Sequence, residues 1–516
     1  MTPSLDNLAL DKLRRQAKQL KRAFNAGEAD VLARVRAVFP ETDGIRHTQA
    51  LHVIAREQGH ESWPRLKLAA ELARMDRDAR AERLKFALYL GQGWVVDDLL
   101  RADPDLPSHN LGLQCALYDV DGLRAALSRD AGAATRIVGI RSPILHLAFS
   151  RHHRAAPETA EAMIAVAELL VAAGADVNDS YPAEPGSEHR LSALYGALGH
   201  AGNLQLAEWL LKHGADPDDN ESLYHATELG HLDGVRLLMR YGVKTGGTNA
   251  LARMLDFDDL DGARLFLEYG ADPNEAVLDH PSGQPIDTIP ALHQAARRGR
   301  DGRFAELLLA HGADPSAVWQ GHRPFALARM YGNAAFADAL AQAGHGDELD
   351  LIEAALAACA EGAAPAGRPL ATMDLDAEQR RILTRVILWQ DRLDHAKALV
   401  AAGIDPDVPE EMDMPPLHLA GWARLPEHVA WLLTLDPDLG HVNAYGGDIV
   451  GTIIHGSKNR LDTERRDHAA CLRLVLEAGA VLRRRELDGA MNEEVVAFLQ
   501  EWAEAHPGRV IDEDGG

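Results

Sequence analysis

Two short segments of the chain hold an unusual set of polar side chains. They read ESLYHATELGH (residues 221–231) and GTNALARMLDFDD (residues 247–259). The side chains that could form one site are Glu221, Tyr224, His225, Glu228, His231, Asn249, Asp256 and Asp258. Carboxylates, imidazoles and a phenol held together can bind a cationic peptide or a small molecule through charge-assisted hydrogen bonds. A solvated helix surface is the plainer alternative, and catalysis would need a fixed nucleophile–base pair that the pattern does not indicate.

The segment MLDFDDLDG (residues 254–262) resembles a calcium-binding loop only superficially. Its aspartates are clustered and Gly262 follows them. However, Leu260 stands where an EF-hand loop needs its fifth-position oxygen ligand, and no glutamate follows at the twelfth position. Comparison with LGHLDGVRLLMRYG, earlier in the chain, instead predicts Asp261, like Asp233, at the N-cap of a helix. The sequence therefore favours a helix start over a cation site.

The familiar motifs of enzyme chemistry are missing from the sequence. It contains no GxSxG, P-loop, GxGxxG, HExxH or CxxC pattern. Cys115, Cys359 and Cys471 are far apart, so we expect neither a disulfide framework nor a thiolate metal site. The histidine pair in RHHR (residues 151–154) has no third ligand at a matching spacing. We therefore expect no enzyme active site, no cofactor and no metal.

Repeated units of two helices must position the polar set. In ALHQAARRGRDGRFAELLLAHGADPSA (residues 291–317), Gly299 ends a first helix and the apolar spacing of FAELLLAHG predicts a second. Gly312 then occupies the left-handed place after that helix, and the following Asp-Pro forms a turn. Equivalent glycines stand at 174, 214, 242, 270, 344, 403 and 479. Neither helix can bury its apolar stripe alone, so the units must stack.

This two-helix unit resembles the ankyrin repeat. The best-matching first-helix segments are PALHQAARRGR, PPLHLAGWARL, ILHLAFS and ESLYHATELGH, and residues 144–345 resemble a family of bacterial ankyrin repeat proteins. The resemblance implies an all-α solenoid of about twelve helix-turn-helix units, from about residue 80 to 505. It implies that the motif histidines His146, His293, His418 and His455 hydrogen-bond neighbouring backbone. It also implies that first helices, which carry the polar set, line a concave face where partners dock.

The chain is predicted to have three parts. Residues 1–78 begin with a basic amphipathic helix and form a small helical module, which could be an N-terminal cap, a docking module or an electrostatic handle. Residues 79–347 form the first ankyrin array. Residues 348–516 hold an irregular unit with an elongated helix, a second ankyrin part and a C-terminal cap. Insertions rich in Pro, Ser and Gly at 179–190 and 276–289 predict exposed loops.

The charge of the chain is large and uneven. The net charge of the 516 residues is −25, although residues 1–85 hold 17 Lys and Arg against 12 Asp and Glu. An acidic body repels nucleic acid and anionic membrane and favours a basic partner, but solubility alone would also explain it. No apolar run approaches the roughly 20 residues of a membrane helix. The N-terminus lacks the apolar stretch of a secretory signal. We expect a cytoplasmic monomer.

These observations predict a non-enzymatic scaffold that presents an acidic concave ankyrin surface to a partner protein. The candidate aromatic anchors are Trp94, Trp209, Trp319, Trp422 and Tyr195, of which Trp209 is expected in the core. One alternative is a sensor or enzyme for a small ligand or metal, with a polar pocket around residues 221–260. Another is an inhibitor or immunity-type protein that occludes a basic target. We expect charge reversal at Glu221 and Glu228 to weaken partner binding without unfolding the protein.

Overall fold

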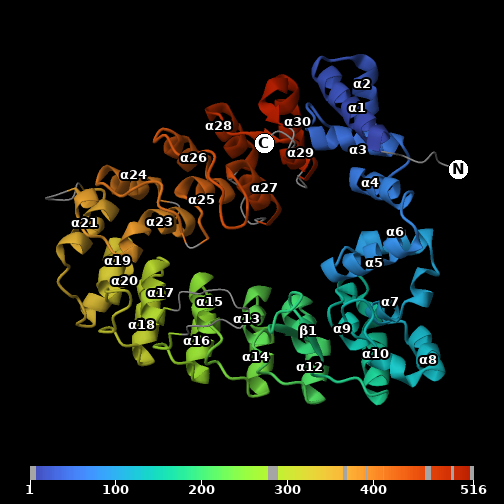
Figure 1. The fold of residues 1–516 in the computed structure, drawn as a ribbon, viewed down its shortest axis with the longest axis horizontal. Coiled ribbons are helices and arrows are strands. Elements are labelled where there is room, and N and C mark those ends of the chain that lie inside the picture. The colour runs from blue at the N-terminus through green and yellow to red at the C-terminus, as the bar shows by residue number, and fades with distance from the viewer. Residues whose placement is uncertain are drawn as a thin grey trace. The chain divides into compact units, whose positions relative to one another are not determined.

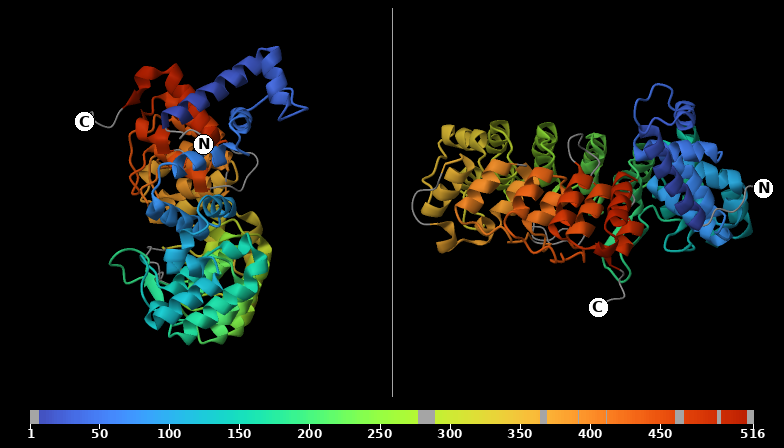
Figure 2. Two further views of the ribbon diagram at one scale, coloured as in Figure 1. Left: turned by 90° about the vertical axis from the view of Figure 1, so that its right-hand side faces the viewer. Right: turned by 90° about the horizontal axis from the view of Figure 1, so that it is seen from above.

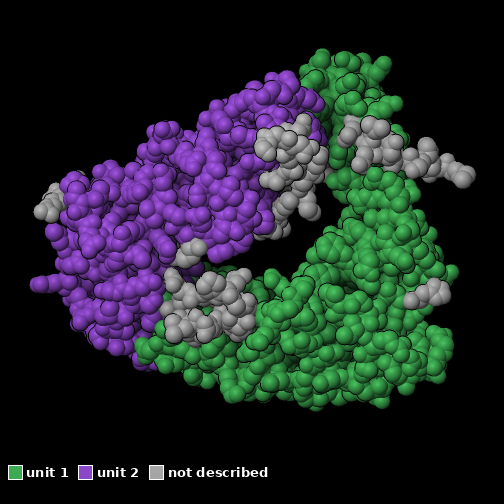
Figure 3. All heavy atoms as spheres, viewed as in Figure 1, with its two compact units in different colours: residues 1–289 green, residues 290–516 purple. Residues whose placement is uncertain are grey.

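A computed structural model describes residues 7–276, 289–363, 369–390, 392–410, 412–459, 467–489 and 493–511. Over these ranges the chain is all-α, with two short pairs of strands (Figure 1). It divides into two compact units, residues 1–289 and residues 290–516, which Figure 3 colours separately. The predicted boundaries after residues 78 and 347 concern repeat organisation and stay a prediction.

Helices α1 (Asn7–Asn25), α2 (Ala29–Arg36), α3 (His47–Glu57) and α4 (Trp63–Leu72) begin the first unit. Buried side chains between residues 10 and 70 form one hydrophobic cluster, in which Trp63 is almost fully enclosed. Ser62 caps α4 by accepting a hydrogen bond from the Arg65 backbone N–H. Leu68 and Leu72, on α4, pack in the next cluster along the chain. The predicted N-terminal module therefore has its own core and shares an apolar surface with the helices after α4.

The other helices of the first unit form two rows. The first-helix row holds α5 (Arg77–Leu90), α7 (Leu111–Ala116), α9 (Pro143–Ala148), α11 (Ala193–Tyr195) with the π-helical turn η5 (Gly196–His200), α13 (Ser222–Ala226) and α15 (Ala250–Asp256). The second-helix row holds α6 (Gly93–Ala102), α8 (Val120–Arg129), α10 (Ala160–Ala172), α12 (Leu204–Lys212), α14 (Asp233–Arg240) and α16 (Leu260–Tyr269). Short 3₁₀ turns are η1 (Leu106–His109), η2 (Ala131–Ala134), η3 (His152–Arg154), η4 (Pro157–Thr159) and η6 (Thr227–Leu229). Each first helix packs against the next first helix in the row.

Helix α12 shows how the sequence produces this arrangement. The Asn203 side chain caps it by accepting from the Leu206 backbone N–H. Leu206 and Leu210 lie one helical turn apart and are both buried. Gly214 follows with φ of 94°, the left-handed backbone that glycine adopts at low cost. Trp209 is buried, which confirms its predicted place in the core.

The insertion at 179–190 is largely exposed, as its composition predicts, but its two ends pair as strands. Strand β1 (Ser180–Pro182) pairs antiparallel with β2 (Arg190–Ser192), with Tyr181 opposite Leu191. The Tyr181 side chain is buried, because the hairpin lies against the first-helix row. The other predicted loop, 276–289, falls almost wholly on residues 277–288, which lie outside the described ranges.

The second unit repeats the two-row arrangement, and Figure 2 shows its helices stacked side by side. First helices are α17 (Ala291–Arg297), α19 (Pro324–Met330), α21 (Leu351–Ala360), α23 (Ile382–Gln390), α25 (Pro416–Trp422) and α27 (Ile449–Asn459). Second helices are α18 (Gly302–Ala310), α20 (Ala334–Gln342), α24 (Leu393–Ala401), α26 (Pro426–Leu433) and α28 (His468–Ala478). The C-terminal part holds β3 (Leu482–Arg483), α29 (Arg484–Gly489), α30 (Glu493–Ala505), η8 (Pro507–Arg509) and β4 (Val510–Ile511), with β3 and β4 parallel.

One repeat of the second unit is irregular, as the sequence predicts. The turn η7 (Leu370–Thr372) and the short helix α22 (Ala377–Arg380) precede α23, which begins at Ile382. Asp376 caps α22 in a reciprocal capping box with Gln379. Helix α24 packs against both α21 and α23, so these two first helices share it as a neighbour. The predicted elongated helix is thus two helices in close succession.

Candidate functional site

A row of alternating charges joins α13 and α15. The His225 ring donates to Glu228 Oε2 from Nδ1 at 2.8 Å and lies 3.0 Å from Glu221 Oε2 through Nε2. The Arg253 guanidinium donates to Glu228 Oε1 at 2.6 Å and to Asp256 Oδ2 at 3.2 Å. We call these five residues the ion-pair row. They bring together four members of the predicted polar set with one residue, Arg253, that the sequence analysis did not select.

Glu221 lies at the buried end of the ion-pair row. Its side chain is 1 % exposed, and Oε1 is 2.5 Å from Nε2 of His189, which follows the turn of the β1–β2 hairpin. Burial alone would raise the Glu221 pKa, but contacts with His225 and His189 outweigh burial and lower that pKa. Reversing this charge would bury cations against one another without a counter-ion. Because Glu221 is buried, we expect charge reversal there to destabilise the fold, in contrast to the expectation from the sequence.

His225 forms the centre of the ion-pair row. Burial would lower the pKa of its imidazole, but hydrogen bonds to Glu221 and Glu228 raise that pKa to about 9. The ring is therefore a cation at neutral pH. It also packs against Tyr195, with ring centroids 5.0 Å apart. A quarter of its side chain stays exposed, so His225 can be reached from solvent.

Arg253 links the two helices of the site. Its guanidinium carbon lies 5.1 Å from the Tyr224 ring centroid and 4.6 Å from that of Phe257. Each of these two first helices also contributes one acid and one cation that are three residues apart. The pairs are His225 with Glu228 and Arg253 with Asp256. From this shared three-residue spacing, Arg253 could have been predicted as a member of the site. His189 gave no such signal, because it lies 32 residues before Glu221 in an insertion.

Three predicted site residues serve the turns around the helices instead. His231 approaches Asp233 at 3.7 Å, between α13 and α14. Asn249 precedes α15 with φ of 55°, and its buried Nδ2 has no hydrogen-bond partner among the residues described. Asp258 follows α15 with φ of 61°, the left-handed backbone that Asp and Asn tolerate better than most residues. All three therefore lie at helix ends, outside the ion-pair row as defined above.

The predicted N-caps of the two second helices are each displaced. Asp259, not Asp261, caps α16 by accepting from the Gly262 backbone N–H at 2.8 Å. Asp261 lies in the first turn of that helix, where its charge faces the positive end of the helix dipole. Asp233 is likewise the first residue of α14 rather than its N-cap. The prediction located each helix start to within two residues, but the N-cap residues are Leu232 for α14 and Asp259 for α16.

The first-helix pairs occupy the same place in successive repeats. Each pair lies five and two residues before a loop residue with positive φ. The pairs are His225 and Glu228 before Gly230, Arg253 and Asp256 before Asp258, and Gln294 and Arg297 before Gly299. Within the last pair, Arg297 donates to the Gln294 side chain at 3.3 Å. The second unit therefore has a counterpart of the ion-pair row on α17.

That counterpart is covered by the chain itself. Glu378, on α22, is 1 % exposed and accepts a hydrogen bond from the Tyr331 hydroxyl at 2.6 Å. It lies 3.4 Å from an Arg297 nitrogen and 3.2 Å from an Arg385 nitrogen. Gln294 and Arg297 are each 4 % exposed beneath it. By contrast, the side chains of Glu228 and Arg253 remain 36 % and 24 % exposed.

The motif histidines are structural where the structure resolves their role. His146 Nε2 lies 2.9 Å from the Val138 carbonyl oxygen, and His293 Nε2 lies 3.1 Å from that of Ala317, as predicted. His418 differs, because its Nδ1 pairs with the Thr452 hydroxyl at 3.2 Å rather than with backbone. The role of His455 stays a prediction. All three cysteines are free and buried.

Two findings on the described part of the chain concern metal binding and membrane crossing. Within it, no group of three or more His, Cys, Asp or Glu side chains is arranged to hold a metal ion. Across the same ranges, no helix combines the length and the apolar character that crossing a membrane requires.

A family model described as ankyrin repeats (3 copies) matches residues 194–277. That range runs from α11 to just beyond α16 and contains the whole ion-pair row. No curated protein matches the chain.

Proposed function

This chain is an ankyrin repeat protein, and we propose that it is a non-enzymatic interaction protein whose ion-pair row binds a basic segment of a partner protein. Ankyrin repeats generally mediate protein–protein interaction, which supports the class of function. The helix pairs on both sides of residues 194–277 have the same two-row arrangement. We therefore extend the repeat to them, giving about twelve ankyrin units in all.

The proposal rests on the solvent exposure of the ion-pair row. It holds three carboxylates, Glu221, Glu228 and Asp256, against the two cations His225 and Arg253. His189, outside the row, also contacts the buried Glu221, and the Glu228 end of the row is the more exposed. The counterpart of the ion-pair row on α17 is already covered by α22, whose Glu378 contacts Arg297. Among the residues that the structure describes, no such helix covers the ion-pair row of the first unit.

The surroundings of the row suit an arginine or lysine side chain. Phe257 is 48 % exposed, and its ring already stacks with the Arg253 guanidinium. A partner guanidinium placed beside Glu228 would gain a charge-assisted hydrogen bond and an aromatic contact together. Such contacts also discriminate strongly against an acidic segment, because like charges would meet. We therefore expect a segment rich in arginine or lysine as the partner.

A charge-reversal pair tests the proposal. The probe is a fluorescent peptide of alternating arginine and glycine, and its anisotropy reports binding to the full chain. Glu228→Lys is compared with Glu208→Lys on α12, since Glu208 is similarly exposed and also pairs with a cation, Lys212, at 3.1 Å. Both variants change the net charge equally. We expect Glu228→Lys to weaken binding about tenfold or more and Glu208→Lys to weaken it less than about twofold.

Equal weakening by the two variants would contradict the proposal. It would mean that the peptide responds to net charge alone and that the ion-pair row is not the binding surface. Circular dichroism of both variants checks that each one is folded.

A further inference from the structure

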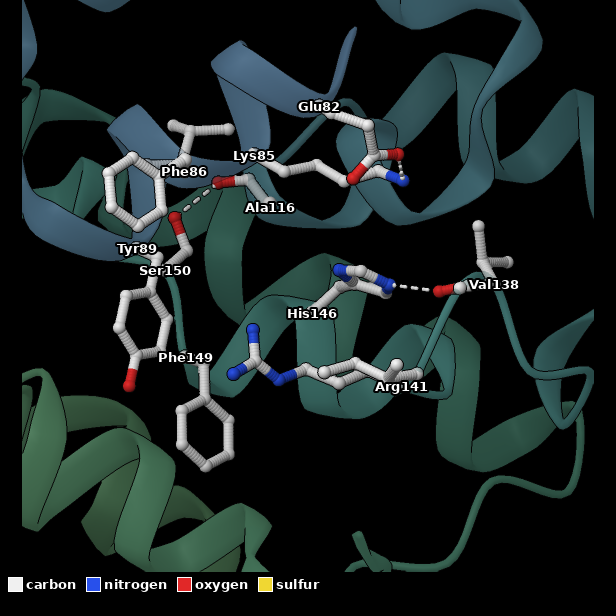
Figure 4. A pocket seen from close by; sticks show the side chains of 13 residues that line it. Glu82, Lys85, Phe86, Tyr89, Ala116, Val138, Arg141, His146, Phe149 and Ser150 are labelled. Atoms are coloured by element: carbon white, nitrogen blue, oxygen red, sulfur yellow. Dashed lines mark hydrogen bonds and ion pairs between the residues drawn. The ribbon is translucent and has the colours of Figure 1, made fainter. Parts of the chain in front are cut away.

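A pocket of about 590 Å³ opens on the first unit, on α5, α7 and α9 (Figure 4). Its lining includes Phe86 and Tyr89 from α5, Ala116 from α7, and Phe149 just after α9. A β-finger made by residues 137–141 forms another wall. The volume lies within the range of ligand pockets, which are mostly apolar with a few placed polar groups.

The pocket exists because α7 contributes a small side chain. Ala116 lies in the lining with Tyr89 and Phe149, the aromatic residues at the ends of the helices on either side. The Tyr89 and Phe149 rings lie nearly parallel, with centroids 6.2 Å apart. The finger is closed by a backbone hydrogen bond from Val138 N–H to the Arg141 carbonyl at 2.8 Å.

Two large apolar residues of the pocket lining are exposed. Phe86 is 55 % exposed, and Ile140 of the finger is 70 % exposed. Scattered apolar residues on a surface are ordinary, but a group of them around a concavity indicates an interaction site. Burying these side chains against a partner would be favourable.

The charge of the pocket is opposite to that of the ion-pair row. The Arg141 guanidinium lies 4.5 to 4.8 Å from the ring centroids of Tyr89, Phe149 and Tyr181, and it donates to the Tyr181 hydroxyl at 2.6 Å. Within the described ranges it forms no ion pair with a carboxylate. Lys85 also lines the pocket, where it pairs with Glu82 at 2.6 Å. Two cations therefore face one carboxylate.

A histidine also lines the pocket. The pKa of His146, which lines the pocket, is lowered to about 4, chiefly by burial and further by the charges of Arg141 and Lys85. His146 is therefore neutral at physiological pH. An anionic group entering the pocket would meet a favourable potential, although the protein as a whole carries a net charge of −25.

We propose that this pocket binds a partner-protein segment in which a large apolar side chain is followed by a carboxylate. The apolar side chain fills the space beside Ala116, and the carboxylate lies against the Arg141 guanidinium. Arg141 is suited to this role because three aromatic rings and a hydroxyl already fix its plane, so little side-chain freedom is lost on binding. This site is separate from the ion-pair row in residues and in charge, and its test does not depend on the proposed function.

The experiment uses the full chain and a labelled peptide, acetyl-Gly-Ser-Phe-Asp-Gly-Ser-amide, with binding followed by anisotropy. Two companion peptides replace Phe by Ala or Asp by Asn. We expect each replacement to weaken binding about tenfold, because one removes the buried side chain and the other a charge-assisted hydrogen bond. Equal affinity of the Asp and Asn peptides would overturn the carboxylate assignment. Absence of saturable binding by the Phe-Asp peptide would overturn the proposal.

Variants of the protein test whether the peptide binds in the pocket. Arg141→Met keeps the apolar stem and should weaken the Phe-Asp peptide about tenfold while leaving the Phe-Asn peptide unchanged. Ile140→Ser alters an exposed residue of the pocket lining. Its control is Val318→Ser, because Val318 is 62 % exposed beside the corresponding finger bridge, Trp319–His322. Weakening by Ile140→Ser alone supports the pocket, whereas equal effects of the two serine variants would overturn it.

Two further measurements distinguish the pocket from the ion-pair row and from a site for free acids. Glu228→Lys should leave the Phe-Asp peptide unaffected, and a matching loss would overturn the separation of the two sites. The small acid 3-phenylpropionate serves as a competitor. If it binds in the pocket while the peptide does not, the pocket accepts a free apolar acid and the partner-segment proposal is wrong.

Discussion

Two histidines, one in each unit, are each held between two carboxylates. His225 lies between Glu221 and Glu228. His322 is only 3 % exposed and lies 2.8 Å from Glu353 and 2.7 Å from Asp376. In both cases burial would lower the imidazole pKa, yet the paired acids raise it to about 9. Two acceptors per ring are enough to reverse the effect of desolvation.

The His225 pKa predicts how stability depends on pH. An unfolded His225 would have a pKa near 6.5, below its folded value of about 9. Its stabilising contribution is therefore complete below pH 6.5 and is lost as the pH rises to about 9. The free energy of unfolding, from urea denaturation, should fall over this window. His225→Gln should flatten the fall by up to about 3 kcal/mol.

The control for this prediction is His231→Gln. His231 is nearly half exposed and approaches Asp233 at 3.7 Å, so the same substitution there should leave the pH dependence unchanged. Identical pH profiles for the two variants would contradict the raised pKa of His225. His322 titrates over the same window in both variants, so the difference between them isolates His225.

At the scale of single elements, α22 is a short helix that carries a buried charge. Its Glu378 contacts Arg297, Arg385 and the Tyr331 hydroxyl in the interior of the second unit. Glu378→Ala would remove the buried carboxylate that contacts both guanidinium groups. We expect the free energy of unfolding to fall by roughly 3–5 kcal/mol, as is typical when one partner of a buried ion pair is removed.

Urea denaturation followed by circular dichroism measures this loss. The matched control is Glu361→Ala, because Glu361 also pairs with an arginine, Arg329, but its side chain is 59 % exposed. An exposed pair of this kind contributes less than about 1 kcal/mol. A loss at Glu378 no larger than that at Glu361 would contradict the buried role of α22.

The elements that the sequence predicts well are those defined by local patterns. A glycine after an apolar stripe indicates the end of a second helix, and Gly214, Gly270 and Gly312 all have the left-handed backbone that this requires. The pairing of helices into stacked units follows, because each stripe needs a neighbour to cover it. The core position of Trp209 is predictable for the same reason.

The contacts that the sequence did not predict join residues that are far apart in the chain. His189 reaches Glu221 across 32 residues, and Glu378 reaches Arg297 across 81. The first contact comes from an insertion and the second from the irregular repeat, and repeat periodicity carries no information about either segment. The burial of Glu221 could not be predicted from the sequence. Its partner His189 lies in a segment whose composition is typical of an exposed loop.

At the scale of the whole molecule, the net charge of −25 should make binding of a basic partner depend on salt. Raising the ionic strength from about 0.1 M to about 1 M shortens the screening length from about 10 Å to about 3 Å. Over that range we expect the affinity for the arginine–glycine peptide to fall about tenfold or more, measured by anisotropy with the full chain. Distant carboxylates contribute to the attraction at low salt only, so Glu208→Lys should differ from the unaltered protein least at high salt.

The Phe-Asp peptide provides the contrast, because its binding at the pocket rests on one carboxylate and a buried apolar side chain. Burial of apolar surface is not screened by salt, and an arginine held among aromatic rings is screened less than an exposed charge. Its affinity should therefore change less than about threefold over the same range. Equal salt dependence of the two peptides would mean that both respond to the field of the whole molecule, and neither local site would then account for its ligand.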